Sequence, residues 1–256
     1  MHKINRSEVS NLPNDIYSGN YIIEEFVNAP VMVTCDGYTI GDKISRFSVH
    51  EYDKQLLQSF SEPYLILRTS HFYESNPQII NDLKAESQKA LKTLLRNKSG
   101  VNPFHFEWFV SSDGKPIFNE VGRRFGGGNL TTIIESEYGV NLLKEYWELE
   151  TSNTNTLTNI KPKEDTPNNL TATFMPYKKK GKIISLPQQQ DFDWTYETRI
   201  LSKIGDTSNG KTTIVTDIPF ISTVQAQTED ELQHKIKRLI NLSKKVVYKK
   251  VDNKKK

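Results

Sequence analysis

The stretch His105–Asn129, HFEWFVSSDGKPIFNEVGRRFGGGN, decides the fold of this chain. Two runs rich in strand-forming residues flank Asp113-Gly114, a dipeptide typical of a two-residue type I′ turn. The stretch is therefore predicted to form a β-hairpin. A turn of that kind fixes the register, and it sets three pairs opposite one another: Ser112 and Lys115, Val110 and Ile117, Glu107 and Glu120.

The opposed carboxylates of Glu107 and Glu120 point to a cation. Two like charges directly across a strand pair repel each other, and Mg²⁺ is the simplest cation for a site built from oxygen ligands. An ordinary surface hairpin with two exposed glutamates is the alternative. The metal interpretation is favoured because the hairpin is apolar around Glu107 and therefore central, with the neighbours Phe104, Phe106, Trp108 and Phe109.

Cationic and glycine-rich residues follow the second glutamate at once. Arg123 and Arg124 come first, and Gly126, Gly127, Gly128 and Asn129 come next. The glycine run is either a flexible turn or a place where backbone N–H groups approach an anion closely. His105 lies on the face of Glu107, opposite Gly122, and is either a metal-side or substrate contact or a packed strand residue. Together these residues form the set that a metal–polyphosphate site needs.

Composition and charge narrow the class of protein. The chain has 256 residues and a net charge of +3, but its basic character is concentrated in the tail from Lys244, which has seven lysines and one aspartate. A solvated terminus is favoured for this tail over binding to nucleic acid or membrane. No apolar run is long enough for a membrane helix, and the start lacks a signal peptide. The single cysteine, Cys35, can by itself form neither an internal disulfide nor a zinc site. Taken together, these observations lead us to expect a soluble cytoplasmic protein.

Hydrophobic periodicity predicts a mixed α+β chain with mainly antiparallel strands. Before residue 151, strands are expected at 21–27, 31–35, 38–49 and 64–67, with Asp36-Gly37 as a turn. Helices are expected from Pro77 to about residue 97, with Ile80, Leu83, Leu91, Leu94 and Leu95 on one face, and at 130–137 and 140–150. After a Thr/Asn/Pro-rich linker at 151–168, strands are expected at 171–176, 182–186, 194–204, 212–217 and 221–227. Thr228 and Glu231 then form the capping box of a closing helix.

One motif is misleading. The residues from Gly205 to Thr212 satisfy the P-loop pattern G-x4-G-K-[ST]. A P-loop must lie between a strand and a helix, because the helix N-terminus binds the phosphate. The β-branched run that follows, with Pro219 soon after it, reads as a strand. We therefore predict a turn between antiparallel strands at this place.

Two segments resemble the ATP-grasp superfamily, most closely the carboxylate–amine ligases with biotin-carboxylase-like organisation. The residues Glu24-Glu25-Phe26-Val27 are similar to the hinge strand that links the two ATP-grasp lobes. The hairpin is similar to the metal and phosphate segment of the same enzymes. The resemblance implies the C-terminal lobe of an ATP-grasp domain, an antiparallel sheet with helices packed on it, followed by a β-rich region with a closing helix.

The resemblance also implies roles for individual residues. Glu24 would offer its carbonyl, and Val27 its N–H, to adenine, with Glu25 and Phe26 between them in the ATP-binding segment. Glu107 and Glu120 would bind Mg²⁺, which Mn²⁺ can replace. Arg124, with Arg123 beside it, would contact the transferred phosphate or an acyl phosphate. The glycine run and Asn129 would hold phosphate or substrate. Many members have Asn where this chain has Gly122.

These matches imply an ATP- and Mg²⁺-dependent ligase, or its C-terminal piece, that joins a carboxylate to an amine through an acyl phosphate. Few residues precede the hinge, so the first lobe and its phosphate-clamping lysines would come from a separate N-terminal piece, or the chain would self-associate. A non-catalytic module that binds nucleotide or protein is the alternative. The expected division is a polar segment 1–20, a partial ATP-grasp domain 21–150, the linker 151–168, a β-rich subdomain 169–243 and the basic tail 244–256.

Overall fold

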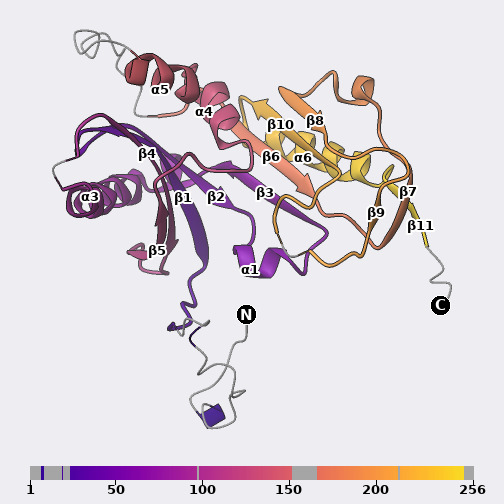
Figure 1. Cartoon of the computed structure of the whole chain (residues 1–256), viewed down its shortest axis with the longest axis horizontal. Helices are drawn as coiled ribbons and strands as arrows, with labels where there is room; N and C mark the ends of the chain where they lie inside the picture. Colours follow the sequence, from indigo (N-terminus) through magenta and orange to yellow (C-terminus); the bar gives the residue numbers. More distant parts are fainter. Residues whose placement is uncertain are drawn as a thin grey trace.

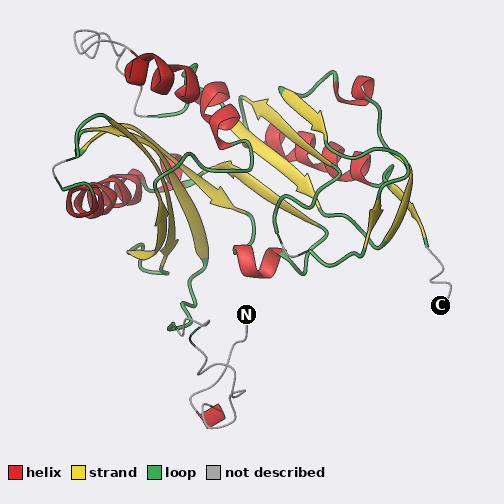
Figure 2. Cartoon of the chain, viewed as in Figure 1, coloured by secondary structure: helices red, strands yellow, loops and turns green. Residues whose placement is uncertain are grey.

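A long antiparallel sheet is the main element of the fold (Figures 1 and 2). We describe it from a computed structural model, for residues 7–8, 19, 24–96, 98–151, 166–212 and 214–250. The sheet has eight strands in the order β5-β4-β1-β2-β3-β6-β10-β8. Their bounds are β1 Val31–Ile40, β2 Lys43–Tyr52, β3 Tyr64–Thr69, β4 Val101–Val110, β5 Pro116–Gly122, β6 Leu170–Pro176, β8 Glu197–Ile200 and β10 Phe220–Ala226. The predicted α+β class with antiparallel strands is confirmed.

Smaller elements complete the chain. A three-stranded sheet has the order β11-β7-β9 and is formed by β7 Gly181–Ser185, β9 Thr207–Ser208 and β11 Val247–Lys249. The helices are α1 Leu56–Ser59, α2 Phe72–Ser75, α3 Pro77–Leu94, α4 Leu130–Tyr138, α5 Leu142–Thr151 and α6 Glu229–Ser243, with a 3₁₀ turn, η4, at Gln189–Phe192. Among the described residues, no helix combines the length and apolar character that crossing a bilayer requires.

The two faces of the large sheet differ in chemistry. Because side chains alternate along a strand, the register places Val33 and Cys35 on one face and Thr34 and Asp36 on the other. Helices α3 and α6 pack on the first face, which is apolar. The second face has a polar row that crosses four strands, and α4 covers part of it beside β6 and β10. We call this second face the polar face.

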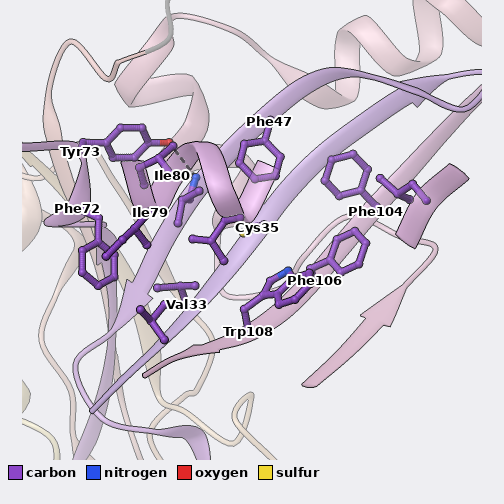
Figure 3. Close-up of a cluster of buried hydrophobic side chains, with 14 of the residues drawn as sticks. Val33, Cys35, Phe47, Phe72, Tyr73, Ile79, Ile80, Phe104, Phe106 and Trp108 are labelled. Atoms are coloured by element: carbon purple, nitrogen blue, oxygen red, sulfur yellow. Dashed lines mark hydrogen bonds between the residues drawn. The ribbon is translucent and has the colours of Figure 1, made fainter. Parts of the chain in front are cut away.

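The apolar face has an aromatic core under α3. Figure 3 shows Val33 and Cys35 of β1 and Phe104, Phe106 and Trp108 of β4 turned toward α2 and α3. Burial raises the pKa of the Cys35 thiol, so that it stays neutral. Pro77 begins α3, as expected for a residue with a fixed φ and no N–H. The predicted helix face is buried except at Leu94, which is 60% exposed.

The predicted turn at Asp36-Gly37 is wrong, because β1 runs through both residues and turns only at Gly41. Gly37 is needed for close packing, since a Cβ there would collide with the carbonyl of Arg46 on β2. Asp36 is 1% exposed and pairs in register with His105 of β4. The Asp-Gly pair therefore has a tertiary cause, a close backbone approach and a buried carboxylate, instead of a turn.

Three other strand predictions also need correction. Residues 24–27 of the expected hinge strand have no regular structure, and its first residues lie outside the described ones. The strand expected at 194–204 shortens to β8, and the described part of 212–217 is turn. Rejection of the P-loop holds, because in the described residues the next helix after Lys211 is α6. The Thr228 hydroxyl caps α6 by accepting from the Glu231 N–H.

Candidate active site

The hairpin of β4 and β5 sets Glu107 opposite Glu120, as predicted, but by a different route. The loop is longer than two residues, because Ser111 N–H donates to the Lys115 carbonyl at 3.0 Å and Gly114 has a φ of 81°. Val110 therefore pairs with Pro116, not with Ile117. A β-bulge between Glu107 and Trp108 then restores the expected register. Bulges of this kind are frequent beside active sites, where they redirect a side chain.

Neighbouring side chains hold Glu107 in place. Glu107 is 7% exposed, accepts a hydrogen bond of 3.1 Å from the Tyr52 hydroxyl and one of 3.3 Å from the Asn119 amide. Burial, together with the Glu107 carboxylate, raises the pKa of Tyr52 well above its ordinary value, so its hydroxyl remains a donor. Glu120 is exposed on β5. One carboxylate is therefore fixed, and the other is free to adapt to a ligand.

His105 is the second titratable group beside Glu107. Its Nε2 lies 3.7 Å from Glu107 Oε1, and its Nδ1 lies 2.8 Å from Asp36 Oδ1. Burial lowers the pKa of His105, but the carboxylates of Asp36 and Glu107 more than offset this, and the pKa rises to about 9. The ring is therefore charged at neutral pH. Its Nδ1 also lies 3.0 Å from the Thr34 hydroxyl.

The two arginines after β5 have different surroundings. Arg123 donates to the Asn102 side chain at 2.6 Å, which ties its guanidinium to β4. Arg124 is exposed and donates to the Phe125 carbonyl at 3.1 Å. The positive charge of Arg124 also lowers the pKa of Tyr52, against the larger effect of burial. Arg124 is thus the arginine that is exposed and whose charge acts on Tyr52, the residue that donates to Glu107.

The glycine run leads directly into α4. A Cβ on Gly126 would collide with Leu130 and Asp36 and would approach His105 Nδ1 to 2.7 Å, so only glycine fits there. Gly128 and Asn129 both have left-handed backbone conformations, with φ of 62° and 61°. The Asn129 side chain donates to Thr223 and accepts from Arg199. The run is therefore a fixed turn packed on the polar face, not a loose linker.

The predicted adenine segment lies apart in the chain from this cluster. Glu24, Glu25 and Phe26 are exposed and Val27 is half-buried, on the stretch that leads into β1 (Figure 1). Sequence reasoning missed Thr34, Asp36, Tyr52 and Asn119, all of which contact Glu107 or His105. Strand alternation continued through Asp36 could have revealed the role of Asp36. The Asp36-Gly37 pair was instead interpreted as a turn.

The donor set fits a cation held partly by other ligands. No group of three or more His, Cys, Asp or Glu side chains in the described part of the chain could bind a metal alone. Two carboxylates with phosphate oxygens and waters are nevertheless what Mg²⁺ commonly takes. The opposed carboxylates on the polar face, and the cradle at Gly126 that a Cβ would fill, are consistent with Mg²⁺ and phosphate.

A separate cavity of about 590 Å³ opens at the end of β3. Its wall includes Arg68, whose guanidinium pairs with Glu229 of α6 and lies 3.7 Å from Glu51. Register places Arg68 and Glu51 on the apolar face, opposite the side that bears Glu107. The arginine of this cavity is therefore already paired, and the cavity does not belong to the hairpin site.

Solved structures with the same fold include a ligase, synthetases and biotin carboxylases. An L-amino acid ligase from Bacillus licheniformis superposes with a TM-score of 0.67 and 14% identity, over 88% of this chain and 55% of that one. A phosphoribosylglycinamide synthetase from Anaerococcus prevotii gives 0.65 and 18%, over 85% and 53%. The biotin carboxylase domain of the Hydrogenobacter thermophilus 2-oxoglutarate carboxylase, with MgADP and bicarbonate, gives 0.60 and 13%, over 88% and 47%.

These likenesses define the fold. No family model and no curated protein matches the sequence. The chain spans about half the length of the first two structures. At such low identity the superpositions carry the architecture and leave the reaction to the site residues. The chain therefore shares the fold of these enzymes over part of their length, the ATP-grasp fold that the hairpin motif led us to expect.

Proposed function

We propose that this chain is the metal- and phosphate-binding part of an ATP- and Mg²⁺-dependent ligase that joins a carboxylate to an amine through an acyl phosphate. The pairing of Glu107 with Glu120 across a bulge, on the polar face where the glycine run also lies, carries the proposal. The rest of the ATP site would lie outside this sequence, on the same polypeptide or on a separate one. The fold, which it shares with ATP-dependent enzymes, supports this assignment.

Each part of the site would have one task. Glu107 and Glu120 would hold one or two Mg²⁺ or Mn²⁺ ions, which neutralise charge on the β- and γ-phosphates when bound. Arg124 would contact the transferred phosphoryl group, because a planar guanidinium suits bidentate binding of phosphate oxygens. The N–H groups of the glycine run and the Asn129 region would face the acyl phosphate. We assign Arg123 to supporting β4, since its guanidinium bonds to Asn102.

The reaction needs no nucleophilic side chain from the protein. A carboxylate oxygen of the substrate would attack the γ-phosphorus of ATP, and ADP would leave. The amine would then attack the acyl carbon, and the C–O bond to phosphate would break to release inorganic phosphate and an amide. Positioning and electrostatic stabilisation supply most of the acceleration in phosphoryl transfer. The segment Glu24–Val27 would contact adenine, with backbone groups as the contacting atoms.

Binding by the isolated chain is the first test. Calorimetry with MgADP should show heat that disappears in EDTA and in the Glu107→Gln variant. Mixing the chain with a candidate N-terminal piece, ATP, carboxylate and amine should then release ADP. MgADP binding without ADP release by any such mixture would support a non-catalytic nucleotide-binding module. No binding of MgADP by the chain or by any such mixture, together with a stable protein partner in pull-down, would argue against both functions and for a protein-interaction role.

A further inference from the structure

Two charged side chains are buried together behind the proposed metal ligand. Asp36 is 1% exposed and His105 is 4% exposed, on adjacent strands β1 and β4. Asp36 Oδ1 lies 2.8 Å from His105 Nδ1, and the Thr34 hydroxyl donates to Asp36 Oδ2 at 2.5 Å. Both oxygens of the Asp36 carboxylate are thus occupied. This arrangement fixes the plane of the His105 ring.

The buried pair touches both halves of the candidate site. On one side, His105 Nε2 lies 3.7 Å from Glu107 Oε1. On the other side, the backbone of Gly126 packs so closely that a Cβ would collide with Asp36 and approach His105. The pair therefore lies between the carboxylate that would hold the metal and the glycine run that would hold phosphate. A shift of Asp36 would move both.

Stability alone does not explain such a pair. Taking two charges out of water is costly, and well-packed apolar residues of similar volume are often as stable. A second buried pair on the polar face shows what a structural role looks like: His50 Nε2 lies 3.0 Å from Glu137 Oε2, and Glu137 also accepts from Thr69, which fastens α4 to β2 and β3. Asp36 and His105 lie on neighbouring strands that backbone hydrogen bonds already join.

We infer that Asp36 is a positioning residue for the metal site: it holds His105 by Nδ1, so that Nε2 is directed at Glu107, and it forms the bed of the glycine run at Gly126. The inference rests on the proposed metal site at Glu107 and Glu120. In other metalloproteins, residues that do not touch the metal themselves hold its ligands in position, and their loss typically costs about 10–100-fold in metal affinity.

Mn²⁺ binding to the full chain, measured by electron paramagnetic resonance, tests this inference without an activity assay. Asp36→Asn keeps the size of the side chain and should weaken Mn²⁺ binding by about 10-fold or more. Thr34→Val removes the hydrogen bond from the Thr34 hydroxyl to Asp36 without changing any charge. It should weaken Mn²⁺ binding several-fold. Glu137→Gln is the matched control, because it neutralises the other buried histidine–carboxylate pair on the same face. It should lower the melting temperature and leave Mn²⁺ affinity unchanged.

The outcomes separate this inference from the proposed function. If the parent binds Mn²⁺ and both Asp36→Asn and Thr34→Val bind it equally well, the positioning role is overturned while the metal site stands. Weakening in Asp36→Asn alone would mean that charge, not position, is responsible, and would also overturn the inference. No Mn²⁺ binding by the parent, either alone or with ADP added to supply phosphate ligands, overturns the metal site and the inference together. If Asp36→Asn does not fold, Thr34→Val decides by the same criterion.

Discussion

Replacing Glu120 by Gln separates the repulsion within the hairpin from its proposed use. Glu120 is exposed and is paired with Glu107 across the strands, and its side chain has no hydrogen bond or ion pair to another described residue. Without metal, the substitution removes a like-charge contact and leaves no partner unsatisfied. We therefore expect Glu120→Gln to be more stable than the parent without metal and to gain less from Mg²⁺.

The magnitudes follow from the position of the two carboxylates. A directly opposed like-charge pair costs about 0.2–1 kcal/mol, which for a chain of this size corresponds to roughly 1–3 °C in melting temperature. Saturation of the parent with Mg²⁺ at about 100 times its dissociation constant adds about 2.7 kcal/mol. The stability order of the two proteins should therefore reverse between EDTA and saturating Mg²⁺.

Glu107→Gln should behave differently because its carboxylate has partners. Tyr52 and Asn119 both donate to it, and the charged ring of His105 lies 3.7 Å away. A hydrogen bond to a charged group contributes about 1.5–3 kcal/mol. Losing part of this outweighs the relief of repulsion, so Glu107→Gln should be less stable than the parent even without metal.

Thermal melts at low ionic strength, in EDTA and across a Mg²⁺ series, measure all these effects, since salt screens the repulsion. Glu62→Gln, in the exposed turn before β3, is the control and should match the parent in both conditions. An unchanged Mg²⁺ response in Glu120→Gln would refute the metal site. A lower stability of Glu120→Gln in EDTA would refute the claim that the two carboxylates repel each other.

Four further substitutions test the packing of the site and the charge pairs in and near it. In urea denaturation, Gly126→Ala should lose at least about 1–3 kcal/mol of stability by overpacking. Gly127→Ala, with nothing within 4 Å of its Cβ, is the control and should lose far less. Equal losses of stability would contradict the packing argument. The pKa of His105 rises from 6.5 to about 9 on folding. The stability lost in His105→Gln should therefore be greatest below pH 6.5 and should vanish as the pH rises through 9. A stability loss that stays constant with pH would contradict this charge effect. Glu145→Gln removes the ionic partner of Arg46 described here, whose side chain is 2% exposed, and should cost about 2–3 kcal/mol in denaturant, discounted because Glu145 is partly exposed. An Mn²⁺ affinity different from the parent's would show that this pair does not act on stability alone.

Local patterns predicted much of the hairpin and both long helices. The turn dipeptide located the hairpin, but the predicted pairs of Glu107 with Glu120 and of His105 with Gly122 hold only because the bulge offsets the longer loop. The start of α3 at Pro77 and the cap of α6 at Thr228 follow from residues adjacent in sequence. These features depend on residues that lie close to each other in the sequence, and sequence patterns can predict contacts of that kind.

Features set by distant residues could not be derived in this way. Gly37 reads as a turn residue by propensity, but the carbonyl of Arg46 needs the space that a Cβ would occupy. Asp36 reads as a turn residue too, and only the pairing of β1 with β4 reveals that it faces His105. Leu94 lies on the predicted apolar stripe, yet it is 60% exposed, whereas Leu91 and Leu95 are buried in the core under α3. Tertiary contact overrides local propensity at each of these positions.

The hairpin sets its two glutamates face to face only because two departures from a regular turn compensate. The longer loop alone would pair Trp108 with Phe118 and continue to pair Glu107 with Asn119, which would put Glu120 on the face of Phe106, among the aromatic core. One extra residue at the bulge returns Glu120 to the polar face. The bulge also sets Val121 opposite Phe106, where it packs against the aromatic core, so apolar packing favours the same register. The bulge moves a carboxylate away from the core and sets it against a like charge, which is the arrangement that a cation between the two would stabilise.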